Sequence, residues 1–352
     1  MSLFEITEND KRIYETELKD FLPDEMFDVH VHVWLKSMDA RKTVPGEKKR
    51  TVTWPSLVAA DNPIEDYIET NRLLFPGKKV GALIFSNEGE SAGKNDYVAD
   101  AAERTGFPAL YFSNPGQSAD EIEEKIRGKG FVGIKSYLDL APKYIPEAEI
   151  RIFDFFPKYQ LERINRMKGI VMLHIPRNGR LKDPVNIAQI AEIKELYPDI
   201  KLIIAHIGRA YTHNDIGDAF ETLDRYPSLY YDFTANCCEY AIHEVIKHAG
   251  SEHVMYGSDM PILRMRTHRI EENNTYINLV PPGLYGDPGQ DSHLREVSPA
   301  EAEKITFFAY EELLAFKRAA LSLGLSRREI RNILCDNAKN LTEQARIDIY
   351  GK

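Results

Sequence analysis

Five side chains of the kinds that bind metal ions follow short apolar segments of this chain. They are His30, His32, His174, His206 and Asp259, and a turn is expected after each segment. Imidazole nitrogens and carboxylate oxygens bind zinc, manganese and iron. A single histidine after an apolar run is usually an ordinary hydrogen-bonded residue, but four segments repeat the pattern here. The repetition predicts a divalent metal site, with zinc favoured over manganese or iron.

The first two histidines share one apolar segment, which runs from Met26 to Trp34. Strand residues two positions apart lie on the same face, about 6.5 Å from each other at ~3.3 Å per residue. We therefore expect His30 and His32 to hold the same ion.

Eight apolar segments of strand length alternate with amphipathic segments of helical length. The predicted strands are Met26–Trp34, Lys79–Ser86, Pro108–Asn114, Phe131–Leu138, Gly169–Ile175, Ile200–Ile207, Leu229–Thr234 and His253–Ser258. The predicted helices include Asn62–Phe75, Asp96–Thr105, Asp120–Arg127, Val185–Tyr197 and Glu239–Ala249, and Gly106, Gly128 and Gly250 are expected helix ends. This alternation, with polar residues at the carboxyl ends of strands, predicts an α/β fold of the TIM-barrel type. An open, doubly wound sheet is the alternative.

Additions to the barrel are expected at three places. Residues 35–61 and 262–299 are long polar insertions, and residues 300–347 are predicted to form helices broken near Gly324. Long loops on the active face often close over a substrate, and solvated surface loops are the alternative. The terminal helices would cover the barrel or form a contact in a homo-oligomer. The pattern predicts one domain over residues 1–352.

Composition restricts the class of partner. The net charge of -10 and the pI near 5.6 argue against nucleic acid or an anionic membrane, and favour a small molecule. Two of the three cysteines, Cys237 and Cys238, are adjacent, so no disulfide framework is expected. No apolar run approaches the ~18 residues of a membrane span, and the first residues lack a signal-peptide core, so we expect a cytoplasmic protein.

The ordered motifs of the chain resemble those of the amidohydrolase superfamily, and its amidohydrolase-2 branch in particular. The motifs are Asp28-Val-His-Val-His32, His174 in Leu-His-Ile-Pro, His206 in Ala-His-Ile-Gly, Gly257-Ser-Asp-Met-Pro261 and the terminal Ile333–Leu341. That branch includes lactonases and other hydrolases. It also includes non-oxidative decarboxylases that act on aminocarboxymuconate semialdehyde and resorcylate.

The resemblance implies a role for each metal-type side chain. His30, His32, His174 and Asp259 would contact the metal, His206 would polarise the bound water or substrate, and Asp259 would also act as a general base. Lys135, at the end of the fourth predicted strand, corresponds to a lysine that is carboxylated and bridges two metals in binuclear relatives. In mononuclear relatives such a lysine is not carboxylated, which is the favoured case here, and a lysine extending to the barrel mouth is the third interpretation.

Four arginines follow the metal-type segments and would supply substrate contacts. They are Arg177, Arg209, Arg264 and Arg266. Guanidinium groups bind carboxylates and phosphates, so we expect a small anionic substrate, although pairing with surface acids is the alternative for each arginine. Three hypotheses follow: a metal-dependent hydrolase of a lactone, amide or ester, a metal-dependent decarboxylase of an aromatic or unsaturated acid, and a non-enzymatic binding protein that keeps the fold.

Overall fold

The eight predicted strands are all present. The structure is a computed structural model that describes residues 3–38, 50, 55–87, 93–287, 289 and 291–351. The strands are shorter than predicted, because regular pairing ends before the buried apolar segments do: Val33, Ile175 and Tyr256 are buried but lie beyond the strands. They are β1 Glu25–His32, β2 Lys79–Phe85, β3 Tyr111–Phe112, β4 Gly133–Lys135, β5 Ile170–Leu173, β6 Lys201–Ile204, β7 Tyr230–Asp232 and β8 Val254–Met255.

The strands close into a parallel barrel. β1 pairs with β2, and β3 to β8 form a six-stranded sheet in sequence order. Parallel bridges between Ile84 and Ala109 and between Val31 and Met260 join the two groups at both seams. The closed arrangement excludes the open, doubly wound sheet and confirms the predicted barrel.

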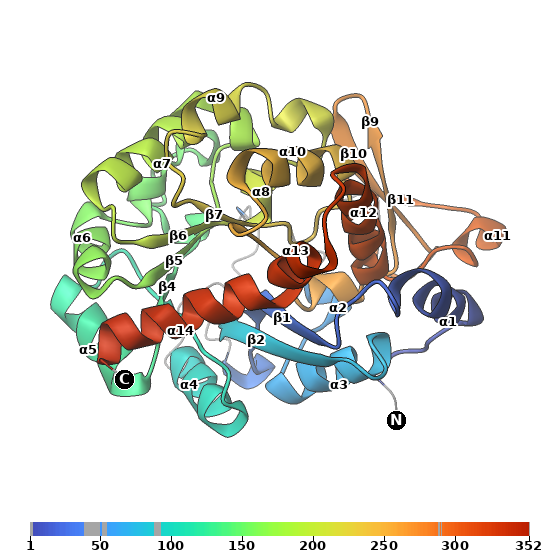
Figure 1. Cartoon of the computed structure of the whole chain (residues 1–352), viewed down its shortest axis with the longest axis horizontal. Coiled ribbons are helices and arrows are strands. Elements are labelled where there is room, and N and C mark those ends of the chain that lie inside the picture. Colours follow the sequence, from blue (N-terminus) through green and yellow to red (C-terminus); the bar gives the residue numbers. More distant parts are fainter. Residues whose placement is uncertain are drawn as a thin grey trace.

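Helices form a ring around the strands (Figure 1). The longer ones after β1 to β7 are α3 Ile64–Leu74, α4 Lys94–Thr105, α5 Ala119–Lys129, α6 Lys158–Met167, α7 Pro184–Leu196 and α10 Glu239–Ala249. Gly106 and Gly250 lie at helix ends as predicted. The prediction for Gly128 was wrong: α5 continues past it to Gly130, whose left-handed φ of 79° ends the helix.

Alternate residues of the strands pack in two different layers. One set, which includes Val171 and Leu202, contacts the surrounding helices. The other set fills the barrel interior, where Val29, Met172 and Ile203 pack together with Leu341 of the C-terminal helix. Period-two alternation places neighbouring residues on opposite faces of a strand, which accounts for the two layers. The interior is therefore a packed core, and polar chemistry is left to the strand ends.

The second insertion contains a small sheet where a loop was expected. β9 His268–Glu272 and β10 Thr275–Val280 are antiparallel, and β11 Leu294–Glu296 pairs with β10. Asn273 and Asn274 form the tight turn with φ of 53° and 60°, values that asparagine tolerates better than most residues. Most of the first insertion, residues 35–61, lies outside the described residues; its described parts include the short α2 Pro55–Val58.

The C-terminal region is helical, with one break more than predicted. α11 Pro299–Ala302 and α12 Phe308–Ser322 are separate, because Phe307 bridges to Arg266 and Thr306 binds Asp10 of the N-terminal helix α1 Glu8–Ile13. After Gly324, α13 Arg327–Arg331 leads through a π-helical turn into α14 Asn337–Tyr350. In Figure 1, α14 crosses the ends of the strands, and its Leu341 contributes to the barrel interior, so this helix covers the barrel as one of the two predictions proposed.

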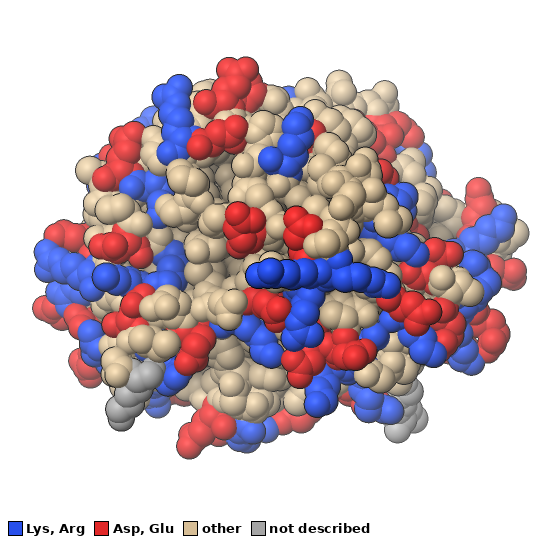
Figure 2. Space-filling model, viewed as in Figure 1, with Lys and Arg blue, Asp and Glu red and all other residues tan. Residues whose placement is uncertain are grey.

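On the face in Figure 2, basic and acidic side chains lie intermixed. Among the described residues, none of the helices has the length and apolar character that crossing a bilayer requires. The three cysteines are free.

Candidate metal centre

A bulge in β1 points His30 and His32 into the barrel. Phe27 and Val29 belong to the interior core, whereas Val31 packs outside, against the helices. The register against β2 shifts between Asp28 and Val31. An extra residue in one strand reverses which face the following side chains occupy. The two histidines therefore lie above the interior core instead of among the helices.

The buried carboxylate of Asp28 holds this bulge against the loop after β8. Its Oδ1 accepts hydrogen bonds from the backbone N–H of His30 at 3.1 Å and of Ser258 at 2.9 Å. Gly257 completes the close approach, because a Cβ there would lie 2.3 Å from Thr234 Oγ1 and 2.9 Å from His30 Cβ. Burial raises the pKa of Asp28 to about 7. The strand ends thus meet closely enough to share one ion.

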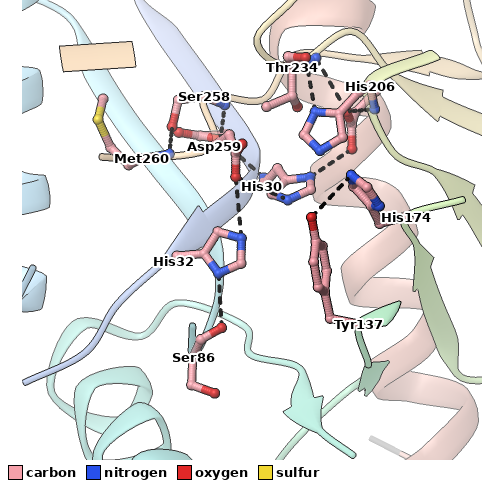
Figure 3. A network of polar contacts seen from close by, with 12 residues as sticks. His30, His32, Ser86, Tyr137, His174, His206, Thr234, Ser258, Asp259 and Met260 are labelled. Atoms are coloured by element: carbon pink, nitrogen blue, oxygen red, sulfur yellow. Dashed lines mark hydrogen bonds and ion pairs between the residues drawn. The ribbon is translucent and has the colours of Figure 1, made fainter. Parts of the chain in front are cut away.

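Asp259 lies opposite the two histidines of β1 (Figure 3). Its Oδ1 is 3.2 Å from His32 Nε2 and 3.5 Å from His30 Nε2. Burial would raise the pKa of Asp259, but the facing imidazoles outweigh this effect and hold the pKa well below its ordinary value. His30, His32 and Asp259 form one group with donor atoms within 4.8 Å of one another.

Asp232, at the end of β7, is a site residue that the sequence reasoning missed. Its Oδ2 lies 3.0 Å from His30 Nδ1, and its Oδ1 accepts hydrogen bonds from the backbone N–H groups of His206 and Thr234. With His30 and His206 it forms a second group of donor atoms within 4.8 Å. The signal was available, because Asp232 is a polar residue at the end of a predicted strand, like the other five.

The outer ring nitrogens of three histidines are fixed by oxygen acceptors. His32 Nδ1 lies 2.9 Å from the carbonyl of Ser86, and His206 Nδ1 lies 3.1 Å from the carbonyl of Thr234. A carbonyl only accepts, so each Nδ1 carries the hydrogen, and His30 Nδ1 does the same toward the Asp232 carboxylate. Each Nε2 therefore has a lone pair for a ligand. This is the outer-shell arrangement that orients metal-binding histidines.

A cation is required where these lone pairs meet Asp259. An Nε2 lone pair 3.2 Å from a carboxylate oxygen is repulsive unless a proton or a metal ion lies between them. Burial lowers the pKa of His30, and lowers that of His206 to about 4, so these two imidazoles are neutral at pH 7. Burial would raise the pKa of Asp232, but its hydrogen bonds and the facing His30 lower it to about 2. Neutral nitrogen ligands beside ionised carboxylates fit a divalent metal.

His174 lies beside the centre but outside both donor groups. Its ring centroid is 5.3 Å from that of His206 and 4.7 Å from that of Tyr137, and its Nε2 lies 3.5 Å from Tyr137 Oη. Its buried Nδ1 has no hydrogen-bond partner among the described residues. Burial, with Arg209 nearby, holds the pKa of His174 well below its usual value. Burial keeps the His174 imidazole neutral beside the histidine cluster, which suits a metal ligand.

Lys135 is buried below the same cluster. Burial lowers its pKa to about 8, although the negative charges of Asp259 and Asp232 act in the opposite direction. Its Nζ lies 5.6 Å from the ring centroid of Phe85 and 5.9 Å from that of Tyr137. Its side chain is 1% exposed, so it does not extend to solvent. An amine of this kind can be carboxylated or can donate a proton.

Strained backbone conformations hold two of the site residues. His206 has a φ of 58° and Asp259 a φ of 49°, both in the left-handed region that residues other than glycine rarely adopt. Such conformations cost roughly 1–3 kcal/mol each and gather at functional sites. The left-handed conformation turns the chain at the end of each strand, so that both side chains face the barrel axis.

Comparison with known families assigns the chain. Residues 27–341 match the amidohydrolase family of the second type. The chain belongs to this family. The match covers both histidines of β1 and Asp259, and it confirms the resemblance seen in the motifs. No curated protein matched the chain.

Solved structures of other proteins have the same barrel fold. A protein described as 2-pyrone-4,6-dicarboxylic acid hydrolase from Pseudomonas putida is 17% identical, with a TM-score of 0.51 over 92% of this chain and 98% of its own. The 2,6-dihydroxybenzoate decarboxylase from Rhizobium is 11% identical, with a TM-score of 0.53 over 92% and 99%. The 5-carboxyvanillate decarboxylase from Novosphingobium aromaticivorans, complexed with manganese, is 13% identical, with a TM-score of 0.54 over 90% and 96%. At these identities the likeness establishes the fold.

In the present structure, three of the four predicted substrate arginines are paired with carboxylates. Arg177 binds Asp183 at 3.1 Å, Arg264 lies 3.8 Å from Asp66, and Arg266 binds Asp10 at 2.6 Å. Arg266 also donates to the carbonyls of Glu5 and Ile305, so it joins the insertion to the N-terminal segment. The structure therefore does not bring Arg266 to the metal centre.

Arg209 differs from the other three. Its Nη1 donates to carbonyls of the loop after β5, the nearest being Pro176 at 3.2 Å. Among the described residues it has no carboxylate partner, so its charge is not neutralised there. Its positive charge also lowers the pKa of His174, which places it near the centre.

Proposed function

We propose that this protein is a metal-dependent hydrolase of a small anionic substrate, with His30, His32, His174 and Asp259 as metal ligands. The observation that carries the proposal is the convergence of fixed imidazole lone pairs on an ionised carboxylate. Bound there, a divalent ion of the zinc or manganese type would lower the pKa of water toward ~7 and polarise a carbonyl oxygen. The donor set is the one such ions take in hydrolytic sites.

The protein's own groups would handle the proton and the developing charge. Asp259, ionised and facing His32, would accept the proton of the attacking water as a general base. His206, whose Nδ1 is fixed by Thr234, would direct its Nε2 side toward the reacting oxygen. Asp232 would keep His30 in the required tautomer, as a positioning residue.

Arg209 would bind the acidic group of the substrate. It is the only one of the four predicted arginines without a carboxylate partner among the described residues, and its guanidinium lies near His174. A charge-assisted hydrogen bond to a carboxylate would fix the orientation of the substrate over the metal. Relatives of known structure are described as acting on carboxylates, which agrees with this substrate class.

A non-oxidative decarboxylase is the second candidate, and Lys135 is the observation that favours it. Loss of carbon dioxide leaves a carbanion that must be protonated, and a buried amine with a pKa of about 8 is mostly protonated at pH 7. Structural neighbours described as decarboxylases of hydroxybenzoates and carboxyvanillate are consistent with this chemistry. The same metal ligands would serve both reactions.

Isotope and gas measurements on one protein preparation decide between the two. The protein would be loaded with zinc or manganese and incubated in ¹⁸O-water with a panel of lactones and hydroxylated aromatic acids. Hydrolysis predicts one ¹⁸O atom in the product acid without carbon dioxide release. Decarboxylation predicts carbon dioxide and a product without solvent oxygen. If the metal-loaded protein converts no lactone and no aromatic acid in the panel, both proposals are wrong, and a binding role remains.

A further inference from the structure

A second cluster of metal-type side chains lies outside the barrel centre. His213, Cys238 and Glu271 place one donor atom each within 4.8 Å of the others. They come from three separate segments: the 3-10 turn His213–Asp215 after β6, the residue that precedes α10, and strand β9 of the inserted sheet. Convergence of three ligand types from distant parts of the sequence distinguishes this cluster from ordinary surface acids.

The contacts within the cluster hold its members in position. His213 Nδ1 lies 2.8 Å from Glu271 Oε2, and the backbone N–H of His213 donates to the same oxygen at 3.1 Å. The His213 ring stacks on Tyr240 at 4.7 Å between centroids. The backbone N–H of Cys238 donates to Asn236 Oδ1 at 2.9 Å. The ligand segments are thus largely preorganised.

The cluster borders a cavity of about 500 Å³. Three carboxylates, Glu239, Glu244 and Glu271, line this cavity together with one guanidinium, that of Arg269. Glu239 is paired with Arg318 and Glu244 with Lys247, so Glu271, which contacts His213, is the carboxylate that lacks a Lys or Arg partner among the described residues and can face a cation. The cavity also leaves room for a water molecule as a fourth ligand.

We propose that His213, Cys238 and Glu271 bind a zinc-type divalent ion that ties the loop after β6, the start of α10 and the inserted sheet together. A thiolate, an imidazole and a carboxylate suit zinc, whereas magnesium and calcium select oxygen ligands. Ligand atoms on tetrahedral zinc at ~2.0 Å lie about 3.3 Å apart, so His213 and Glu271 need to separate by only about 0.5 Å. On binding, the Cys238 thiol loses its proton to solvent and a sulfur–metal bond forms, with no change of oxidation state.

The position of the ion gives it a role at the mouth of the barrel. Tyr211, two residues before His213, lines the same cavity, and its ring centroid is 6.4 Å from that of His206. The three tied segments follow β6, β7 and β8, which carry or precede His206, Asp232 and Asp259. The ion would therefore stabilise the loops that surround the central site, without contacting it.

Cobalt titration of the full-length protein tests this site separately from the central one. The protein would be prepared without an affinity tag, stripped with a chelator and titrated with Co²⁺. The central centre offers nitrogen and oxygen donors only, so a sulfur-to-cobalt charge-transfer band in the near ultraviolet reports the second cluster. We expect the band in the wild type and in His30→Asn, and its loss in Cys238→Ser. Glu271→Gln should keep the band and weaken cobalt binding by more than about 10-fold, because losing a ligand should cost at least as much as losing an outer-shell partner.

Matched controls decide the assignment. Cys335→Ser removes a buried thiol of the barrel interior and should leave the band unchanged. Cobalt binding without a charge-transfer band in the wild type, or a band that persists in Cys238→Ser, would overturn the proposal. If Cys238→Ser does not fold, alkylation of the wild type replaces it: zinc should protect Cys238 from iodoacetamide, and unchanged labelling would overturn the proposal as well.

Discussion

Asp232 and Asp10 are both fully buried carboxylates, yet they serve two different regions of the molecule. Asp232 lies at the barrel mouth and binds the imidazole of His30 and the backbone of His206. Asp10 lies on the N-terminal helix and binds both terminal nitrogens of Arg266 and the hydroxyl of Thr306. In both cases hydrogen bonds and nearby basic groups outweigh burial and lower the pKa of the carboxyl.

The two carboxylates differ in their hydrogen-bond partners, but not in their burial or in the direction of their pKa shift. Arg266 is always positively charged and only donates hydrogen bonds. It therefore neutralises Asp10 and leaves no lone pair of its own for a metal ion. Neutral His30 donates one hydrogen to Asp232 and keeps a lone pair on its other nitrogen for an ion. A buried carboxylate therefore indicates a metal centre only when it is hydrogen-bonded to an imidazole whose other nitrogen keeps a free lone pair. The following predictions test this distinction.

The largest effect is expected from Asp259, the carboxylate at the metal itself. Asp259→Asn removes the general base and one metal ligand, so kcat/KM should fall by about 10²–10⁴-fold on any substrate found in the panel. Metal content would be measured alongside by plasma mass spectrometry. Asp10→Asn is the matched control, with the same change of side chain, and its folded protein should retain the wild-type kcat/KM. Equal losses in the two variants would remove the distinction between the regions.

Asp232→Asn should weaken metal binding at the centre by about 10–100-fold, because outer-shell partners orient the ligand and increase its basicity. The amide keeps the shape of the side chain but can present an N–H to His30 Nδ1, which favours the wrong tautomer. Competition with a chromophoric zinc chelator measures the dissociation constant. Unchanged affinity would show that His30 does not depend on Asp232.

Asp10→Asn should instead lower the free energy of unfolding, by about 2 kcal/mol at pH 7, the range for hydrogen bonds to charged groups. The pKa of Asp10 is lowered on folding, so its contribution is complete above the unfolded value of about 3.9 and disappears as the pH falls through the lowered value. The difference between wild type and variant in urea unfolding should thus shrink below about pH 4. A difference that is constant from pH 7 to pH 3 would contradict an ionic role for Asp10.

The sequence predicted the positions of the strands and five of the candidate site residues, because apolar runs that end in polar residues mark the carboxyl ends of barrel strands. The sequence could not predict that the histidines of β1 face the barrel interior. Simple alternation places His30 and His32 with Asp28, opposite Phe27 and Val29, and only the bulge opposite β2 reverses them. A bulge depends on the register between two strands, which a single segment does not encode.

Other differences have the same origin in tertiary contacts. Arg266 and Arg209 are indistinguishable as basic residues near metal-type motifs, but Asp10, 256 positions away in the chain, binds only the first. The inserted sheet was expected to be a loop because residues 262–299 form a long polar insertion with several prolines and glycines, and its strands pair only with one another. Asp232 is different, because its position at the end of a predicted strand can be seen in the sequence. It was missed because it lies in none of the motifs from which the site residues were chosen.

The smallest effect is expected from substitution of Arg209. This test distinguishes an arginine that binds the substrate from one that only stabilises the structure. Arg209→Gln should raise KM for an anionic substrate about 10-fold, close to the lower end of the 1.5–3 kcal/mol that a charge-assisted hydrogen bond contributes, and leave the metal content unchanged. The matched control is Arg177→Gln, because Arg177 already binds Asp183 at 3.1 Å. Neutral analogues in which an amide replaces the carboxylate should lose this difference between Arg209→Gln and the wild type. If KM rises equally for charged and neutral analogues, Arg209 acts by holding the loop after β5 through its carbonyl contacts and not by binding the substrate.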